Sequence, residues 1–140
     1  MYEKILLPTD GSEGAEKAFK HAKELADKYG AELHILYVAD IRIESVSDFV
    51  SNISGALEEA GRETTEELEE KAADQGINAI TVVRKGTPHS EINDYVQEEG
   101  IDMVVMGTHG RTGIDRMLLG STTEKIVRTS EVPVLTVGRD

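Results

Sequence analysis

The sequence contains no cysteine and no tryptophan, and only 4% of its 140 residues are aromatic. Without cysteine, the chain can form no disulfide, hold no metal through thiolates and use no cysteine nucleophile. This absence excludes those kinds of chemistry but leaves the cellular compartment open.

Long apolar runs are also absent. Apolar runs such as residues 5–7 and 104–106 are far shorter than the roughly 20 residues that span a bilayer. The first four residues lead directly into a strand-like run, without the basic segment and apolar core of a secretory signal. We therefore expect a cytoplasmic protein that makes no use of a membrane.

Basic residues are scarce beside acidic ones: 15 Lys and Arg against 27 Asp and Glu give a net charge of −12. Such a surface repels a phosphate backbone, which argues against nucleic acid as a partner. A single phosphate group can still be held locally, because a helix N-terminus offers free N–H groups and about half a positive charge.

The length and the composition, with 39% hydrophobic and 30% charged residues, are typical of one globular domain. We expect a single domain over residues 1–140. Strand-like runs occur at 3–8, 31–38, 77–83, 101–106 and 132–137. The apolar residues of the first helical tract, which Gly30 ends, are Ala15, Ala18, Phe19, Ala22, Leu25, Ala26 and Tyr29.

Three further helical tracts lie between the later strands. An acidic tract ends at Gly76, but Gly55 and Gly61 leave its beginning open. A third helix follows Thr87-Pro88 and ends at Gly100, and a fourth opens at residues 121–124. This alternation predicts a doubly wound α/β domain, with a five-stranded parallel sheet and helices on both faces.

In such sheets, ligands bind beyond the carboxyl ends of the strands, where the winding direction reverses. Two loops compete for that place, residues 8–12 and 107–121. The second contains four glycines, Gly107, Gly110, Gly113 and Gly120. Because glycine costs roughly 0.5 to 1 kcal/mol in ordered structure, we expect either turns with positive φ or a ligand against bare backbone.

The spacing Gly-x2-Gly-x9-Gly-Ser over residues 107–121 occurs with ILLPTDGSEGAEKA near the amino end and VPVLTVG near the carboxyl end. With these features the chain resembles the universal stress protein family, in its ATP-binding subgroup, from Lys4 to Val137. The resemblance implies a Rossmann-like sheet in strand order 3-2-1-4-5. In that order both candidate loops flank the same crevice.

The resemblance also implies a binding site. Adenosine contacts fall on Pro8, Thr9, Asp10, Val38 and Met106, and ribose and phosphate contacts fall on Gly107, Gly110, Gly120, Ser121, Thr122 and Thr123. The residue types suit these roles, since Val38 and Met106 can enclose a flat purine and a helix start attracts phosphates. The anionic Asp10 belongs at the adenosine end or facing a metal.

Each assignment has a structural alternative. Ser121-x-x-Glu124 is equally a capping box that closes the helix start without a ligand. Residues 10–12 form an ordinary turn and N-cap, the interpretation favoured without the family resemblance. Val38 and Met106, taken alone, are core residues.

The histidines show no metal-ligand spacing: we expect His21 and His34 on the polar sides of their elements and His109 in solvent. A P-loop needs a lysine after Gly120, and the sequence has none there. Neither a dinucleotide fingerprint, a His-Glu-x-x-His motif nor a Ser/His/Asp arrangement stands out. Binding is therefore better supported than turnover.

The sequence thus predicts an ATP-binding stress-response protein, a nucleotide-dependent switch or sensor, with or without Mg²⁺ or Mn²⁺. The alternatives are a slow metal-dependent ATPase or phosphotransferase that uses Asp10, and a nucleotide-free interaction module. We also expect a homodimer through strand 132–137, because no Lys or Glu interrupts this apolar edge between Glu131 and Arg139. In the alternative, loop 115–120 covers the edge of a monomer.

Overall fold

The computed structural model describes residues 1–40, 47–109 and 119–138. Its elements are β1 (Lys4–Thr9), α1 (Glu13–Tyr29), β2 (Glu32–Asp40), α2 (Ser47–Ala73), β3 (Ala79–Gly86), α3 (Pro88–Glu99), β4 (Met103–Gly107), α4 (Ser121–Thr129) and β5 (Val134–Val137). Within the described ranges, no helix is both long and apolar enough to cross a membrane.

The five strands form one sheet in the order β3-β2-β1-β4-β5, and every neighbouring pair is parallel. The predicted fold class and strand order are confirmed. The chain winds from β1 outward through β2 to β3, then returns to the other side of β1 for β4 and β5. The winding therefore reverses between β1 and β4, where an open α/β sheet places its ligands.

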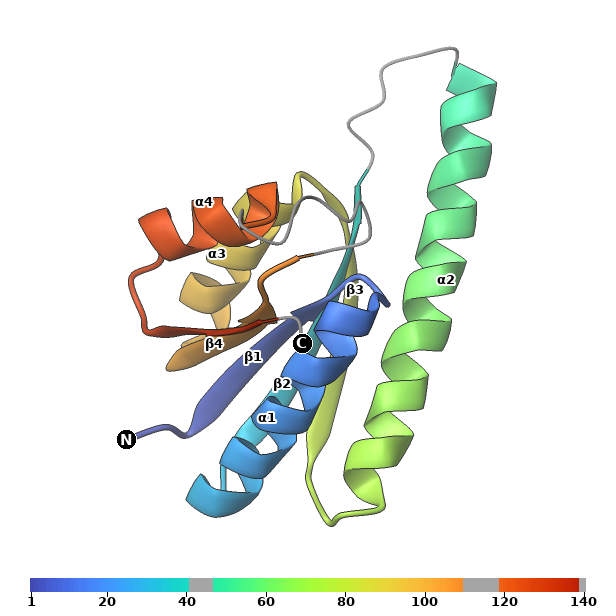
Figure 1. Cartoon of the computed structure of the whole chain (residues 1–140). Helices are drawn as coiled ribbons and strands as arrows, with labels where there is room; N and C mark the ends of the chain where they lie inside the picture. The colour runs from blue at the N-terminus through green and yellow to red at the C-terminus, as the bar shows by residue number, and fades with distance from the viewer. Residues whose placement is uncertain (41–46, 110–118, 139–140) are drawn as a thin grey trace.

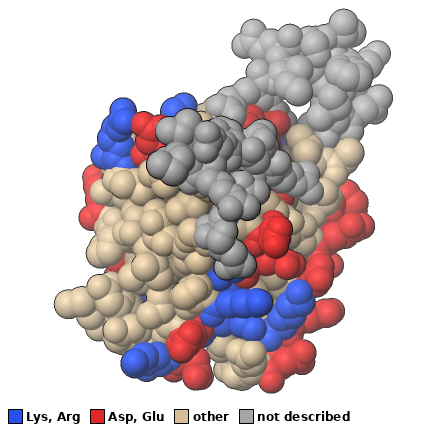
Figure 2. Space-filling view, in the orientation of Figure 1, with Lys and Arg blue, Asp and Glu red and all other residues tan. Residues whose placement is uncertain are grey.

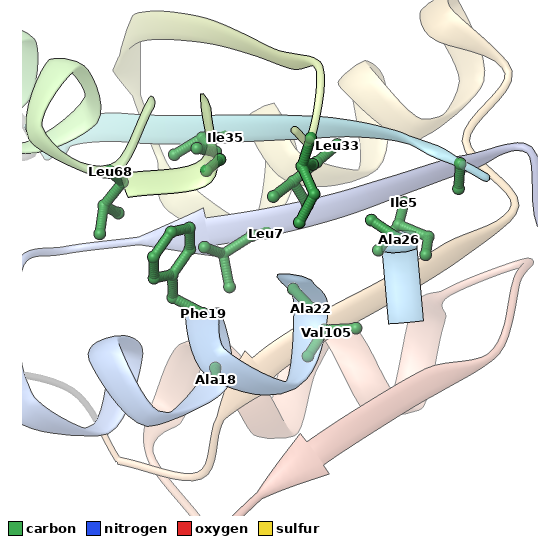
Figure 3. Packing of buried hydrophobic residues seen from close by; sticks show 13 residues of the cluster. Ile5, Leu7, Ala18, Phe19, Ala22, Ala26, Leu33, Ile35, Leu68 and Val105 are labelled. Carbon is green, nitrogen blue, oxygen red and sulfur yellow. The ribbon is translucent and has the colours of Figure 1, made fainter. Parts of the chain in front are cut away.

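Helices α1 and α2 cover one face of the sheet, and α3 and α4 cover the other (Figure 1). Figure 3 shows the first of the two cores, in which Phe19 and Ala22 of α1 pack on Leu7 and Ile35 of the central strands. The second core joins Leu6 and Leu36 to helix residues such as Ile126. Burial on both faces explains why the central strands read as continuous apolar runs.

Most helix boundaries follow the sequence signals. Gly30 and Gly100 end α1 and α3 in the left-handed conformation, as predicted from their positions. Tyr29, however, is about half exposed and stacks edge-on against Tyr2 instead of joining the core.

Helix α2 begins at Ser47 and continues through both Gly55 and Gly61. Gly61 is buried against β2, where an added Cβ would lie 2.5 Å from the Tyr37 ring. The close approach of α2 to β2 thus requires glycine at position 61. This is one of the two glycines from which the sequence could not fix where the helix begins.

His34 lies in the core instead of on a polar side, because β2 is a central strand and α3 covers this side chain. Its Nδ1 lies 2.5 Å from the Tyr95 hydroxyl and its Nε2 lies 2.6 Å from Glu32 Oε1. A neutral imidazole with its proton on Nε2 satisfies all three groups: Nε2–H donates to Glu32, and the Tyr95 hydroxyl donates to Nδ1. The expectation for His34 was wrong, whereas exposed His21 agrees with it.

Tyr95 makes stability sensitive to high pH. Burial, with a further contribution from the charge of Glu99, raises the pKa of Tyr95 from 10.0 to about 12. Above pH 10 the phenol ionises in the unfolded chain but stays neutral in the fold, so its contribution to stability is complete below pH 10 and disappears towards pH 12. We expect the free energy of unfolding, measured with urea, to fall by up to about 2 kcal/mol between pH 9 and 11.5 in the wild type. Tyr95→Phe should lack this decrease. Parallel pH profiles of the two proteins would contradict this.

Candidate functional site

The turn from β1 into α1 forms one wall of the crevice. Asp10 Oδ1 accepts from the Ser12 N–H at 2.9 Å, and Ser12 Oγ accepts from the Ala15 N–H at 3.2 Å as the N-cap of α1. Thr9 Oγ1 accepts from the Gly11 N–H at 3.2 Å. These side chains therefore make the turn and N-cap that the sequence suggested as an alternative to ligand binding.

The opposite wall consists of the end of β4 and the start of α4. The Gly120 N–H donates to Thr108 O at 2.6 Å, and the Thr123 hydroxyl donates to Gly107 O at 2.7 Å. Both bonds connect the two ends of the glycine-rich loop, so α4 begins directly beside the end of β4.

Helix α4 begins at a glycine N-cap. This residue is Gly120, and no side chain among the described residues caps the helix, so the capping-box alternative for Ser121 and Glu124 was wrong. Ser121 already lies inside the helix, because the first intrahelical bond runs from the Glu124 N–H to Gly120 O at 2.9 Å. The N–H groups of the first turn have no acceptor within the helix, and a helix start of this kind is a favourable place for an anion.

The two described motif glycines, Gly107 and Gly120, both have ordinary backbone conformations. Neither has positive φ, and Gly120 has φ −59° and ψ 151°, which other residues adopt freely. Gly107 instead lies against α1, where an added Cβ would be 2.8 Å from Gly14 O. Gly107 is thus required by helix packing, while no turn explains Gly120.

A cavity of about 330 Å³ opens between these walls at the carboxyl edge of the sheet. All the predicted site residues that the structure describes line it: Pro8, Thr9, Asp10, Val38, Met106, Gly107, Gly120, Ser121, Thr122 and Thr123. Gly110 lies outside the described residues. The volume falls within the range of small-molecule sites.

The cavity has two chemically different ends. At one end lie the first turn of α4 and the hydroxyl groups of Ser121 and Thr122. On the other side of β1, Leu36 and Val38 of β2 supply apolar surface, and Asp40 at the end of β2 adds a carboxylate. An anionic group therefore belongs at the α4 end, and a neutral, flat group belongs near β2.

Strand β2 extends past the end of β1 at this edge. The ladder between β1 and β2 ends with Thr9 opposite Tyr37, whereas the ladder between β2 and β3 continues to Asp40. Backbone groups of residues 38–40 on the β1 side consequently face the crevice instead of a strand. A row of N–H and C=O groups there can read the edge of a heterocyclic base.

The family model of the universal stress proteins matches residues 1–138. The chain belongs to the universal stress protein family. It is 37% identical over 145 aligned residues to universal stress protein MJ0531 of Methanocaldococcus jannaschii, with 98% of this chain and 82% of that protein covered. The solved structure of MJ0577 from the same organism has a TM-score of 0.91 and 39% identity, covering 100% of this chain and 98% of that one.

Two other solved universal stress proteins carry nucleotides. One was determined in complex with cAMP (TM-score 0.72, 22% identity, covering 98% of this chain and 97% of that one). The other, from Arabidopsis thaliana, has AMP bound (TM-score 0.69, 18% identity, covering 99% and 92%). At these identities the likeness concerns the fold.

The cavity of this universal stress protein also includes residues that the sequence analysis did not assign to the binding site. They are Ser12, Ala15, Leu36, Tyr37, Asp40, Leu57, Pro88, Ile92 and His109. Leu36 and Asp40 flank Val38 at a spacing of two, so strand alternation alone could have added them. Pro88 and Ile92 come from α3, and the sequence does not show how that helix packs over β2.

His109 was expected in solvent but is buried, with Nδ1 3.0 Å from Thr108 Oγ1. Its carbonyl oxygen packs close to Gly14, where an added Cβ would lie at 2.6 Å. The start of α1 covers this residue, a contact between segments far apart in the chain.

Proposed function

We propose that this universal stress protein is a single domain that binds ATP in the cavity at the carboxyl edge of its sheet. One observation supports this above all: the start of α4, which no described side chain caps, and the apolar residues Leu36 and Val38 of β2 line one cavity from opposite sides of β1. This arrangement suits a ligand that joins a polyanion to a flat, neutral ring. A triphosphate at α4 gains both the helix dipole and N–H donors.

The adenosine end of the proposed complex uses the second core. Val38 and Met106 lie on the α3 side of the sheet with Leu36, so the base continues an apolar layer that is already packed. The cAMP and AMP complexes of distant family members support an adenine nucleotide as the class of ligand.

In this proposal nucleotide occupancy acts as a switch or sensor state. A bound Mg²⁺ or Mn²⁺ would depend largely on the phosphates, because the described residues contain no group of three or more His, Asp or Glu that could hold an ion. Contacts made mainly by backbone hold a ground state and aim no charge at a transition state. We therefore place slow ATP hydrolysis or phosphate transfer second.

The surface fits a small-molecule ligand in the cytoplasm better than nucleic acid. Figure 2 shows acidic side chains along the side of the molecule where α2 lies. Exposed α2 residues with this charge are Glu59, Glu63, Glu66, Glu67 and Glu70. This face repels the phosphate backbone of a nucleic acid.

The proposed function is tested by the nucleotide that the protein carries. Freshly purified protein is heat-denatured and the supernatant is separated by anion-exchange chromatography, with adenine nucleotide as the expected product. The nucleotide-free protein should then bind added ATP in a calorimetric titration. A protein that releases no nucleotide and shows no heat with ATP would favour the interaction module instead.

We further propose a homodimer through β5. This strand is the edge of the sheet, and its residues Val134, Leu135 and Val137 are only half-buried. An edge with such side chains favours pairing with a symmetric copy. We expect sedimentation equilibrium at micromolar concentration to give a dimer mass, and Leu135→Lys to give a monomer. A monomeric wild type excludes the dimer, and a dimeric Leu135→Lys excludes this interface.

A further inference from the structure

The sheet has a second edge at β3, beside α2, which the proposed dimer leaves open (Figure 1). Among the described residues, β2 is the only strand neighbour of β3. The Leu33 N–H donates to Asn78 O at 3.1 Å, so Asn78 and every second residue after it direct their backbone groups to β2. The N–H and C=O groups of Ala79, Thr81 and Val83 therefore point away from the sheet.

Strand β3 has little of the protection that edge strands usually carry. It is eight residues long, contains no proline, and is uncharged and largely β-branched over residues 79–83. Its two basic residues lie at the carboxyl end, where Arg84 pairs with Glu98 at 2.6 Å and Lys85 pairs with Glu58 at 2.5 Å. Because natural edges are blunted by short strands, inserted charges or proline, most of β3 is suited to receive another strand.

One face of this edge is apolar. Val82 packs against the second core, and Ile80 lies on the same face because side chains two residues apart point the same way. Helix α3 packs over β2, where the Tyr95 and His34 rings meet, and leaves Ile80 38% exposed and Val82 half-buried. Apolar surface thus remains accessible beside the open edge.

The other face lies under the acidic helix α2. Glu58 pairs with Lys85 and so marks the side of α2 that faces β3. Glu69 follows Glu58 by three helical turns on the same side, about 16 Å further along, which is level with Ile80 because the chain reverses direction between α2 and β3. Glu66 lies one turn before Glu69. Within residues 1–40, 47–109 and 119–138, neither Glu66 nor Glu69 belongs to an ion pair.

The charge of α2 decides between the possible occupants of this edge. The helix carries eight acidic residues and two basic ones. Antiparallel pairing of two copies through β3 would continue the sheet and bring both α2 helices side by side on one face, where their charges repel. A basic segment of a different protein instead matches the charge of this face.

We propose that the β3 edge binds an extended segment of a partner protein as an additional strand, with Lys or Arg at alternate positions and β-branched residues between them. Alternate side chains of a strand point to opposite faces. The basic ones therefore meet Glu66 and Glu69, and the apolar ones continue the surface of Ile80 and Val82. The outward backbone groups of residues 79–83 supply the hydrogen bonds of strand addition. This inference does not rest on nucleotide binding.

Three peptides of the length of β3 test the proposal: one alternates Lys and Val, one alternates Glu and Val, and one has four Lys followed by four Val. Each is titrated into ¹⁵N-labelled protein at physiological salt, and binding is measured from amide chemical shifts. The third peptide has the charge and composition of the first, so it measures unspecific attraction to a chain of net charge −12.

The alternating Lys-Val peptide should bind at least about tenfold more tightly than the other two, because only its side chains match both faces. It should also slow hydrogen exchange at the amides of Thr81 and Val83, whose N–H groups gain acceptors. Equal binding of the alternating and block Lys-Val peptides, or unchanged exchange at both amides under saturation, would overturn the proposal.

Two variants separate the backbone and charge contributions. Thr81→Pro removes an outward N–H and should weaken the alternating Lys-Val peptide at least about tenfold. Glu69→Lys should weaken it about threefold to tenfold. Glu67→Lys is the matched control, because Glu67 pairs with Lys71 on the α1 side of the same helix, and it should bind the peptide like the wild type.

The Glu69→Lys comparison stands even if Thr81→Pro does not fold. Equal peptide affinity of Glu69→Lys and Glu67→Lys would refute recognition by the acidic face. Sedimentation equilibrium examines the competing occupant: self-association of the wild type that Thr81→Pro or Glu69→Lys changes would assign this edge to a second copy and overturn the proposal.

Discussion

Gly120→Val should weaken ATP binding by about tenfold to a hundredfold, the equivalent of losing one charge-assisted hydrogen bond. Gly120 is the N-cap of α4 and lines the cavity at the end where the triphosphate is proposed. Its φ of −59° and ψ of 151° suit valine, so the backbone itself does not require glycine. The branched side chain instead occupies space that the phosphates need.

The folded state should survive this substitution. Valine is a poorer N-cap than glycine, which costs about 1 kcal/mol of stability and leaves a cooperative thermal unfolding transition. Gly138→Val is the matched control, because an added Cβ there meets nothing within 4 Å and the residue does not line the cavity. Calorimetric titration of both variants with ATP measures this effect. Wild-type affinity in folded Gly120→Val would show that the phosphates do not bind at the start of α4.

Gly107→Ala should lower the free energy of unfolding by about 1 to 3 kcal/mol, the usual cost of overpacking. The added Cβ would lie 2.8 Å from the carbonyl oxygen and 2.9 Å from the carbonyl carbon of Gly14, and neither is a side-chain atom that can turn away. Relief requires α1 to move away from β4. ATP affinity should fall as well, because both segments line the cavity.

Gly55→Ala provides the control for Gly107→Ala. Gly55 lies in α2 with nothing within 4 Å of an added Cβ, so alanine should stabilise the helix by about 0.5 to 1 kcal/mol. Urea denaturation of both variants measures the two effects with opposite sign. Equal stability of Gly107→Ala and the wild type would show that the start of α1 and the end of β4 are not closely packed.

The fold was largely predictable because its signals are local. Apolar runs bounded by Gly30, Gly76 and Gly100 mark where strands and helices alternate, and alternation implies a parallel sheet. The strand order came from the family resemblance, because periodicity carries no information about which strands are neighbours. The site residues that the family resemblance marks follow the ends of parallel strands, and they meet at the carboxyl edge of the sheet.

The remaining features depend on contacts between distant segments. Gly107 meets Gly14 only because α1 crosses the end of β4, and a sequence pattern does not encode that approach. The extension of β2 beyond β1 depends on register, so the sequence could not predict that the backbone of residues 38–40 lacks a strand partner on the β1 side. A histidine in a strand is expected on the polar side of that strand. His34 is buried instead, because Tyr95 and Glu32 provide hydrogen-bond partners for its ring.

The most direct measurement of nucleotide binding in this cavity is an amide chemical-shift titration of ¹⁵N-labelled, nucleotide-free protein with ATP and with adenosine. ATP should shift the backbone amides of residues 120–123 at the start of α4 and those of residues 38–40 at the end of β2, whereas adenosine should shift mainly the second group. This pattern would place the phosphates at α4 and the base at β2. Saturation with ATP that leaves both groups unshifted, or that shifts only residues outside the cavity, would contradict nucleotide binding at this site.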